Sequence, residues 1–522
     1  MIFQIQLTHI RHSIISLHLT ILSKHTIFIM RATFYFFLLF IIIQLHFEAK
    51  AIGFQRSYTL EDVVEKAREE SPDAMAARHR YRGSYWQHKS YEAGYLPHVS
   101  FDATLPNLNR SISAITLPDG SDVFMRRNLA TSSSSVSINQ TIGLTGGEIF
   151  INSGLERIDL IKDEEIETSY LSTPVNIGFR QPIFAYNPYR WERKIEPIRY
   201  REARQSYIEE LENISINATN LFFDLLMAQI NVEINKVNLN NNDTLYQIAK
   251  GRYSLGRIAE NELLQMELNY LNSLTELEES EINYEAALFR LRSYLGLESD
   301  EEITLIPPAN IPELNIEPHL ALEQAEANRS DMLAYERQKI QAESEVHQAR
   351  ADSRLNANLY AVYGLTQSAS EFIDAYSSPL DRQQLVVGVQ IPILDWGVSK
   401  GQRKMAESNR ELINTNVEQA LNDFEHEIYL RVLEFNRLDE RLNIAAKADT
   451  IASKNYEVTR ERFLIGNIGV IDLNIAYQEK DRATQSYLRA LHNYWRGFYE
   501  MRKLTLYNFI EDQPITVRFE EL

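Results

Sequence analysis

GRYSLGRIAENELLQ at residues 251–265 recurs later in the chain as ERFLIGNIGVIDLNI at residues 461–475. In each stretch a helix-forming sequence reaches a glycine, Gly256 or Gly466, and a second helix-forming sequence follows. The two glycines are 210 positions apart. Because a motif that returns at a fixed offset is the signature of an internal repeat, the chain is predicted to contain one structural unit twice.

Landmarks away from the glycines keep the same order in both copies. Pro182 in NIGFRQPIF and Pro392 in VVGVQIPIL are also 210 positions apart. Upstream, SPDAMAA at 71–77 aligns with RSDMLAY at 329–335 at an offset of 258, which leaves 48 extra residues in the first copy. Each copy is therefore predicted to run helix, strand, variable segment, strand, long helix, glycine turn and return helix.

These landmarks divide the chain into a first repeat at 58–310, a second repeat at 311–510 and a polar tail at 511–522. The elements expected in the first repeat are strands at about 97–105 and 174–184, an extra hairpin at about 133–156, a long helix at about 198–250 and a return helix at 260–295. Those expected in the second are strands at about 355–366 and 384–394, a long helix at about 398–462 and a return helix at 470–505.

Residues 1–51 differ in kind from the rest. Arg31 precedes the apolar run Phe34–Phe47, which ends in an A-x-A-like site at Ala51. This pattern predicts a cleaved signal peptide, and we expect the true start to be Met30. The run is shorter than the roughly 17–25 residues that a membrane-spanning helix needs. The chain has no cysteine, which excludes disulfides, thiolate metal sites and N-terminal lipid attachment.

The predicted strands have one apolar and one polar face. In QLVVGVQIPIL the apolar side chains alternate with polar ones, beginning at Leu385 and Val387. NIGFRQPIF and LNANLYAVYGL repeat this alternation. Strands of about ten residues with this pattern are typical of outer-membrane barrels, and a soluble sheet with one wet face is the alternative.

The predicted helices favour the outer-membrane barrel over the soluble sheet. From Leu211 to Val232 apolar residues recur at steps of three and four, which is a coiled-coil seam. Four strands cannot close a barrel, and unpaired sheet edges are not tolerated in hydrocarbon. Three chains with four strands each give twelve strands, so the prediction is a trimer. The extra hairpin is expected on the surface, because adding it to the wall gives eighteen strands and a barrel wider than its helical extension.

The duplicated strands, the long helices, the R-[YF]-x-x-G turns and the D/E-x-L return helices resemble the TolC-type outer membrane efflux protein family, also called outer membrane factors, over about Tyr58–Asn508. The resemblance implies a mixed α and β membrane protein: a trimeric 12-stranded transmembrane β-barrel continued by a long periplasmic α-helical coiled-coil barrel, built from an internal duplication. It further implies the exit duct of a tripartite efflux or type I secretion system, a passive conduit for small molecules or polypeptides.

The same resemblance implies a homotrimer that contacts outer membrane lipid, a periplasmic adaptor (membrane fusion) protein and an inner-membrane pump of RND or ABC type. The expected location is the outer membrane of a Gram-negative bacterium, with a large periplasmic portion and no lipidation. A nucleic-acid partner is not expected, since the formal net charge is −19.

Family members with a carboxylate gate carry two acids one helical turn apart after the second glycine, and here Asp472 matches the first and Ile475 the second. A tyrosine and an arginine that hold the family's tip shut are replaced by Phe463 and Ile468. We expect residues of the first turn to compensate: Tyr253, Arg257 and Glu262. A ring of carboxylates favours cations, whereas apolar rings gate by dewetting. The alternative for Asp472 is an ordinary helix-start acid.

Two further groups of residues are predicted. Helix-turn tip and adaptor docking are assigned to Gly256, Leu263, Gly466 and Leu473. The junction between barrel and helices is assigned to Pro182, Pro392, Trp191 and Trp396, the tryptophans as candidates for an interfacial aromatic belt with ordinary core packing as the alternative.

Other classes of protein are disfavoured. No H-x-x-x-H zinc helix, P-loop or G-x-S-x-G motif occurs, so no catalytic residue, metal site or cofactor is expected. An exported coiled-coil structural or adhesin-like envelope protein is the alternative function, but it leaves four matched amphipathic strands unexplained.

Overall fold

A computed structural model describes the chain except for residues 1–55, 163–164, 298–302 and 520–522, which places the expected leader outside the described residues. The chain forms two compact units. The first comprises Asp224–Ile258, Leu263–Ala309 and the described part of the segment that ends at Val63. The second comprises Val64–Phe223, Ala259–Glu262 and Asn310–Leu522.

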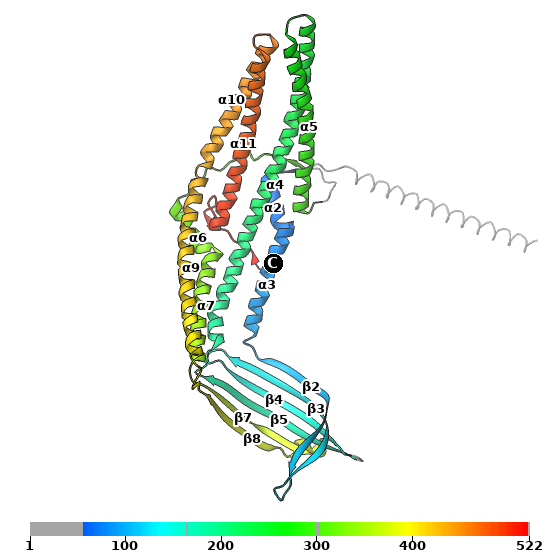
Figure 1. Ribbon diagram of the computed structural model, residues 1–522, viewed down its shortest axis with the longest axis vertical. Helices are drawn as coiled ribbons and strands as arrows, with labels where there is room; N and C mark the ends of the chain where they lie inside the picture. The colour runs from blue at the N-terminus through cyan, green and yellow to red at the C-terminus, as the bar shows by residue number, and fades with distance from the viewer. Residues whose placement is uncertain (1–55, 163–164, 298–302, 520–522) are drawn as a thin grey trace, which may run out of the picture. The chain divides into compact units, whose positions relative to one another are not determined.

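The second unit contains an antiparallel sheet of six strands in the order β2-β3-β4-β5-β7-β8 (Figure 1). The strands are β2 (His98–Thr116), β3 (Asp122–Ile142), β4 (Gly147–Ile161), β5 (Ile166–Ile183), β7 (Asn356–Ala369) and β8 (Leu380–Gln390). β2 and β8 form the two edges of this sheet.

The prediction of a surface hairpin is wrong. The predicted count of four strands per chain, on which the twelve-stranded barrel depended, is therefore wrong as well. The extra residues form β3 and β4, which pair with each other from Leu129↔Leu160 to Ile142↔Gly147. β3 also pairs with β2, and β4 with β5. Both strands lie inside the sheet because their apolar and polar faces alternate in phase with those of their neighbours.

The strands also differ in length from the predicted ranges. β2 extends to Thr116 instead of ending near residue 105, and β5 begins at Ile166 instead of near 174. β8 ends at Gln390, so Pro392 follows the strand, whereas Pro182 lies inside β5. Proline has no N–H to donate to a ladder, which explains why a strand stops before it or carries it near an end.

One helix of the second unit is capped by the side chain that precedes it. α3 (Pro72–Ala93) begins after Ser71, whose hydroxyl accepts a hydrogen bond from the Ala74 N–H at 3.1 Å. The remaining long helices are α7 (Ser330–Asp352), α9 (Val398–Phe435), α10 (Leu438–Leu464) and α11 (Val470–Thr505). α10 and α11 lie side by side as an antiparallel pair (Figure 1). α9 packs against α7.

The single long helix predicted at about 398–462 is two helices, α9 and α10. The helix is interrupted at Asn436 and Arg437. The Asn436 side chain accepts a hydrogen bond from the Ile316 N–H at 2.9 Å and donates one to the Ile316 carbonyl at 2.8 Å. The interruption therefore coincides with the point where the segment between the two repeats is attached to the helix.

The first unit is built on the C-terminal part of α4 (Pro188–Ser254) and on α5 (Glu260–Leu295). Tyr246 of α4 stacks on Tyr270 of α5 with ring centroids 6.0 Å apart, and the Asn235 amide donates to the Glu276 carbonyl at 3.1 Å. The short parallel pair β1 (Arg56–Tyr58) and β6 (Ile303–Leu305) completes the unit. α4 begins ten residues before the predicted start at 198 and includes Pro197.

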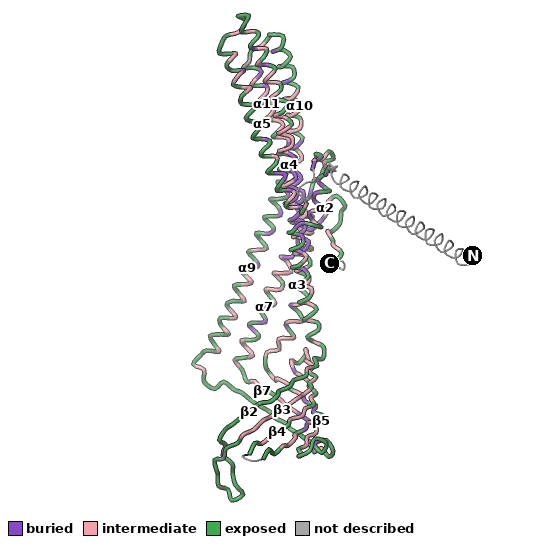
Figure 2. Tube along the Cα trace, turned by 90° about the vertical axis from the view of Figure 1, so that its right-hand side faces the viewer, coloured by how far each residue is buried: buried purple, intermediate pink, exposed green. Residues whose placement is uncertain are grey.

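Short elements complete the second unit. They are α6 (Pro318–Asn328), α8 (Asp374–Ser377), β9 (Tyr507–Asn508) and β10 (Gln513–Pro514), while α2 (Leu60–Glu70) spans the division between the units. β10 pairs with β9, so part of the predicted polar tail folds back on the end of α11. Buried side chains gather on the helices, whereas β2 is exposed along most of its length (Figure 2).

Candidate functional site: the faces of the sheet and the glycine turns

One face of the sheet carries an apolar band that crosses all six strands. Cross-strand partners on this face are apolar on both sides at Val99↔Ile138, Ile138↔Ile151, Ile151↔Ile177 and Leu359↔Val387. At both edges the band is at least half exposed, at 68 % for Phe101 on β2 and 61 % for Val387 on β8. A soluble protein rarely exposes so large an apolar surface, so this band is expected to contact a membrane or another protein.

The opposite face of the same strands is polar and carries a charged cluster. Arg180 on β5 donates to the Glu148 carboxylate on β4 at 2.9 Å, and its guanidinium lies 5.9 Å from the ring centroids of Phe150 and Tyr360. The Phe150 ring covers Gly178 on the neighbouring strand, where a Cβ atom would lie 2.0 Å from a ring carbon. A lining of this kind suits contact with water and solutes.

Aromatic residues follow both strands that lead into long helices. Phe184 directly after β5 and Trp396 before α9 have left-handed φ values of 65° and 54°. Bulky residues rarely adopt this conformation, so both positions carry backbone strain. Trp396 is 89 % exposed, whereas Trp191 is buried and packs against His347 with ring centroids 5.1 Å apart. Trp191 therefore belongs to the core, and its prediction as a belt residue is wrong.

The two glycine turns have the same backbone structure. In the first, the Gly256 N–H donates to the Tyr253 carbonyl at 2.8 Å and the Arg257 N–H to the Arg252 carbonyl at 2.9 Å. In the second, the N–H groups of Gly466 and Asn467 make the corresponding bonds, each at 2.9 Å. Both glycines have positive φ, 66° and 83°. This is the Schellman ending of a helix, which favours glycine at the left-handed position.

Residues of the second turn divide into exposed and buried positions. Asp472 lies in the first turn of α11 and is exposed, as is Ile475, which is 52 % exposed. Leu473 between them is only 2 % exposed. A side chain buried in this way offers no surface to a partner, so the structure contradicts the prediction of Leu473 as a docking residue; the gate role of Asp472 and Ile475 stays a prediction.

The first turn presents its predicted residues outward. Tyr253, Arg257 and Glu262 are exposed, and Leu263 is half-buried. Tyr253 is 43 % exposed and Arg257 follows the left-handed Gly256. These side chains are accessible to a partner or to the pore, and both assignments stay predictions.

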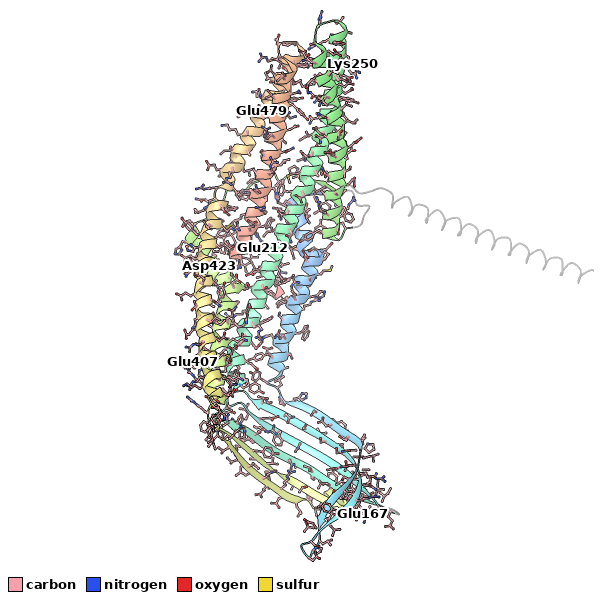
Figure 3. All side chains as sticks on the ribbon, in the orientation of Figure 1. Glu167, Glu212, Lys250, Glu407, Asp423 and Glu479 are labelled. Atoms are coloured by element: carbon pink, nitrogen blue, oxygen red, sulfur yellow. The ribbon has the colours of Figure 1, made fainter. Side chains whose placement is uncertain are left out.

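A buried ionic cluster in the second unit was not predicted from the sequence. The Glu212 side chain is fully buried and accepts hydrogen bonds from Arg68 at 2.8 Å and from Arg502 at 2.9 and 3.1 Å (Figure 3). The cluster connects α2, α4 and α11. Its members are separated by 144 and 290 residues, so no local spacing could reveal it.

A second missed feature is the attachment of the segment that joins the repeats. In the first unit Gln229 of α4 accepts from the Leu305 N–H at 3.1 Å and donates to the Leu305 carbonyl at 3.3 Å. In the second unit Asn436 binds both backbone groups of Ile316 in the same way. One amide side chain in each unit therefore fixes this segment by two hydrogen bonds.

Neither a metal site nor a helical membrane anchor is found in the part of the chain that the structure describes. No group of three or more His, Asp or Glu side chains is placed to bind a metal ion there. None of the described helices is both long enough and apolar enough to cross a bilayer.

Comparison with solved structures identifies the class of fold. The CmeC outer membrane channel of Campylobacter jejuni is 16 % identical with a TM-score of 0.62, and the match covers 85 % of each chain. The outer-membrane channel OprN is 17 % identical with a TM-score of 0.61, covering 85 % of this chain and 89 % of OprN. VceC from Vibrio cholerae is 15 % identical with a TM-score of 0.60, covering 85 % and 95 %. The chain has the fold of outer membrane channels.

Sequence comparison finds a family match in one part of the chain. Residues 321–505 match the family of outer membrane efflux proteins, and no curated protein sequence matches the chain. That segment is thus similar to the outer membrane efflux proteins, and the chain as a whole shares the fold of the outer membrane channels. The resemblance drawn from its repeated turns and strands is thereby confirmed.

Proposed function

We propose that this protein is the exit duct of a tripartite efflux or type I secretion system. It conducts small molecules or polypeptides passively across the outer membrane and the periplasm, and it performs no catalysis. The observation that carries the proposal is the sheet, which has an apolar band across one face and polar side chains on the other. An apolar outer band and a polar interior are what a transmembrane β-barrel needs.

The proposed assembly is a homotrimer in the outer membrane, with the helices in the periplasm. The sheet has two free edges and cannot remain open in hydrocarbon. On α10, Ile444, Ile451 and Val458 recur every seven residues and are each at least half exposed. Such a stripe is suited to packing against another helix, and this supports self-association. The internal duplication is part of the same proposal, and the matching Schellman turns support it.

The proposed partners are a periplasmic adaptor protein and an inner-membrane pump of RND or ABC type. The proposed docking residues are Gly256 and Leu263 at the first turn and Gly466 at the second, while Tyr253, Arg257 and Glu262 are proposed for the gate. Asp472 is proposed to line the periplasmic opening and to select cations, since a ring of carboxylates repels anions.

Single-channel recording of the purified oligomer in planar bilayers tests both parts of the proposal. The wild type is expected to give small, cation-selective openings, and Asp472→Ala to give openings that are larger or less selective. Glu479→Ala is the matched control, because Glu479 is exposed on the same helix seven residues further on. Equal behaviour of all three proteins contradicts the gate role of Asp472 alone. An inserted, folded oligomer that never conducts contradicts the duct.

A further inference from the structure

We propose that β8 of one copy pairs with β2 of the next, so that a trimer closes an eighteen-stranded barrel. The inference rests on the proposed trimeric duct and adds the identity of the closing strands and the width of the exit. The six-stranded sheet of one copy, its apolar band and its two edge strands carry it.

The first support is the position of the extra hairpin. β3 has a partner strand on each side along Leu129–Asn139, and β4 has partners on both sides over most of its length. Removing the hairpin from the wall breaks these ladders and leaves backbone N–H and C=O groups unpaired. In hydrocarbon each unpaired group is costly, so the hairpin belongs to the wall.

The second support is the phase of the side chains. Ile138 of β3 and Ile151 of β4 face each other on the apolar side, and their neighbours in β2 and β5 are Val99 and Ile177. On the polar side of the hairpin Asn139 faces Phe150, next to Gly178 of β5. In a hairpin folded over the outside of a barrel, the apolar and polar residues need not match those of β2 and β5 on both faces of the sheet.

The third support is the pair of edges. β2 begins at His98, shortly after α3 ends, and β8 ends at Gln390, shortly before α9 begins. The two edge strands therefore run in opposite directions relative to the helices and suit antiparallel pairing between copies. β8 has 11 residues. β2 offers a comparable stretch before Pro106, where the missing N–H and a register shift interrupt the ladder.

The apolar band selects the register between copies. If Val99, Phe101 and Ala103 lie opposite Val389, Val387 and Leu385, the band continues across the joint without a polar interruption. The opposite face then brings Ser100 beside Gly388. A shift by one residue would turn every apolar side chain of one edge toward the polar interior.

An eighteen-stranded barrel has a wider exit than the twelve-stranded one first predicted. Barrel diameter grows roughly linearly with strand number, so the barrel is about half as wide again, and barrels of this size leave an aqueous channel. The sheet therefore does not limit the size of the cargo, which must be selected at another level of the duct.

Cysteine cross-linking tests the pairing, and the absence of natural cysteine leaves the background clean. Purified oligomer with Phe101→Cys and Val387→Cys is oxidised and analysed on a non-reducing gel. The expected result is a ladder that ends at three joined chains. Ser100→Cys with Gly388→Cys is a second pair on the polar face, where Gly388 has room for a side chain. Phe101→Cys with Val386→Cys, whose side chains point to opposite faces, is expected to remain uncoupled.

A pair within one chain tests the position of the hairpin. Ile151→Cys with Ile177→Cys joins β4 to β5 and is expected to form a disulfide, detected by peptide mass. Phe101→Cys with Ile177→Cys joins β2 to β5 and forms only in a four-stranded wall. Formation of this last disulfide, or absence of both links between copies, overturns the inference. If the inference is overturned but the reduced variants still conduct ions, the proposed duct stands and only the strand pairing is wrong. A wild-type protein that does not conduct ions contradicts the duct itself.

Discussion

Glu212 shows how much one buried carboxylate can hold together. It accepts hydrogen bonds from two arginines on two other helices and has no exposed side-chain surface. Glu212→Gln keeps the shape but removes the charge that both arginines need. Breaking a buried ion pair by removing one partner costs roughly 3–5 kcal/mol. A lower melting temperature is expected for the detergent-solubilised protein, measured by far-ultraviolet circular dichroism at a fixed heating rate.

Glu210→Gln is the matched control for this prediction. Glu210 pairs with Arg80, whose side chain is 62 % exposed, and an exposed ion pair contributes roughly 0–1 kcal/mol. Equal melting temperatures for the two variants would show that the Glu212 cluster is not a point of special stability.

Asp481 on α11 predicts a dependence on pH. Burial raises the pKa of this carboxyl above its ordinary value of 3.8, although the Tyr477 hydroxyl and Lys480 oppose the shift. One carboxyl oxygen of Asp481 is buried without a hydrogen-bond partner among the described residues. The folded state therefore binds this proton more tightly than the unfolded state. The stabilisation is fully present below pH 3.8 and is lost as pH rises through the raised pKa.

Asp481→Asn should consequently raise the melting temperature at neutral pH and lose that advantage at about pH 4. The test is the difference in melting temperature between variant and wild type at the two pH values, which cancels the titration of other groups. Glu479→Gln, at an exposed position of the same helix, should give a small difference that does not change with pH. A variant less stable than the wild type at neutral pH would contradict the assignment.

Prediction from sequence at this scale reached local features and missed distant ones. The left-handed conformation of Gly256 and Gly466 follows from the residues around them, because a helix must end there. The contacts of Glu212 and Asn436 depend on segments more than 100 residues away. Leu473 was assigned to docking because the family motif gives its position in the chain but not the direction of its side chain.

Among the elements, β5 and β7 approach each other closely at Gly364. A Cβ atom there would lie 2.4 Å from the Val175 carbonyl oxygen and 2.7 Å from the Asn176 Cα atom. Backbone atoms cannot move aside as a flexible side chain can. Gly364→Ala is therefore expected to cost about 1–3 kcal/mol, the usual range for overpacking. The loss should appear as a lower melting temperature of the β signal in circular dichroism.

Gly388→Ala on the neighbouring strand β8 is the control. The nearest atom to its added methyl group is the Asn358 carbonyl oxygen at 3.9 Å, an ordinary contact distance. This variant should melt like the wild type. If Gly364→Ala also melts like the wild type, the two strands have room to separate at that point.

Helices and strands differed in how well the sequence predicted them. The ends of α5 and α11 follow from the glycine turns and the apolar period, and the structure has them at Glu260–Leu295 and Val470–Thr505. The division of α9 from α10 has no proline or glycine to indicate it and depends on the contact with Ile316. The prediction that the β3–β4 hairpin lies outside the sheet was wrong. It relied on equal numbers of strands and helices, whereas the alternation of apolar and polar residues in the hairpin indicates two strands of the sheet.

For the whole molecule, the two faces of the sheet predict opposite responses to charge. Val387→Arg introduces a charge on the apolar face of β8, where an arginine at the bilayer midplane costs roughly 2–4 kcal/mol. Gln384→Arg introduces the same side chain on the polar face of the same strand. The first variant should lose recovery in the outer membrane fraction, and the second should not. Equal recovery of both would contradict a lipid-facing band.

The fold class was predictable because it depends on the spacing of apolar residues, and the same helical and strand spacings recur along the chain. The number of strands in the sheet was not, since it depends on which neighbours the strands of the chain pair with. The predicted repeats at 58–310 and 311–510 describe the order of elements along the chain, whereas the second compact unit combines Val64–Phe223 with Asn310–Leu522.

The outer part of the β2–β3 hairpin is connected to the rest of the protein in an unusual way. From Arg110↔Asn128 to Thr116↔Asp122 the two strands pair only with each other among the described residues. Insertions or deletions in this stretch leave every other ladder intact. Natural variation in length should therefore accumulate there and not at Gly364 or Gly178, and an epitope placed beside Gly120 would be carried without disturbing the fold.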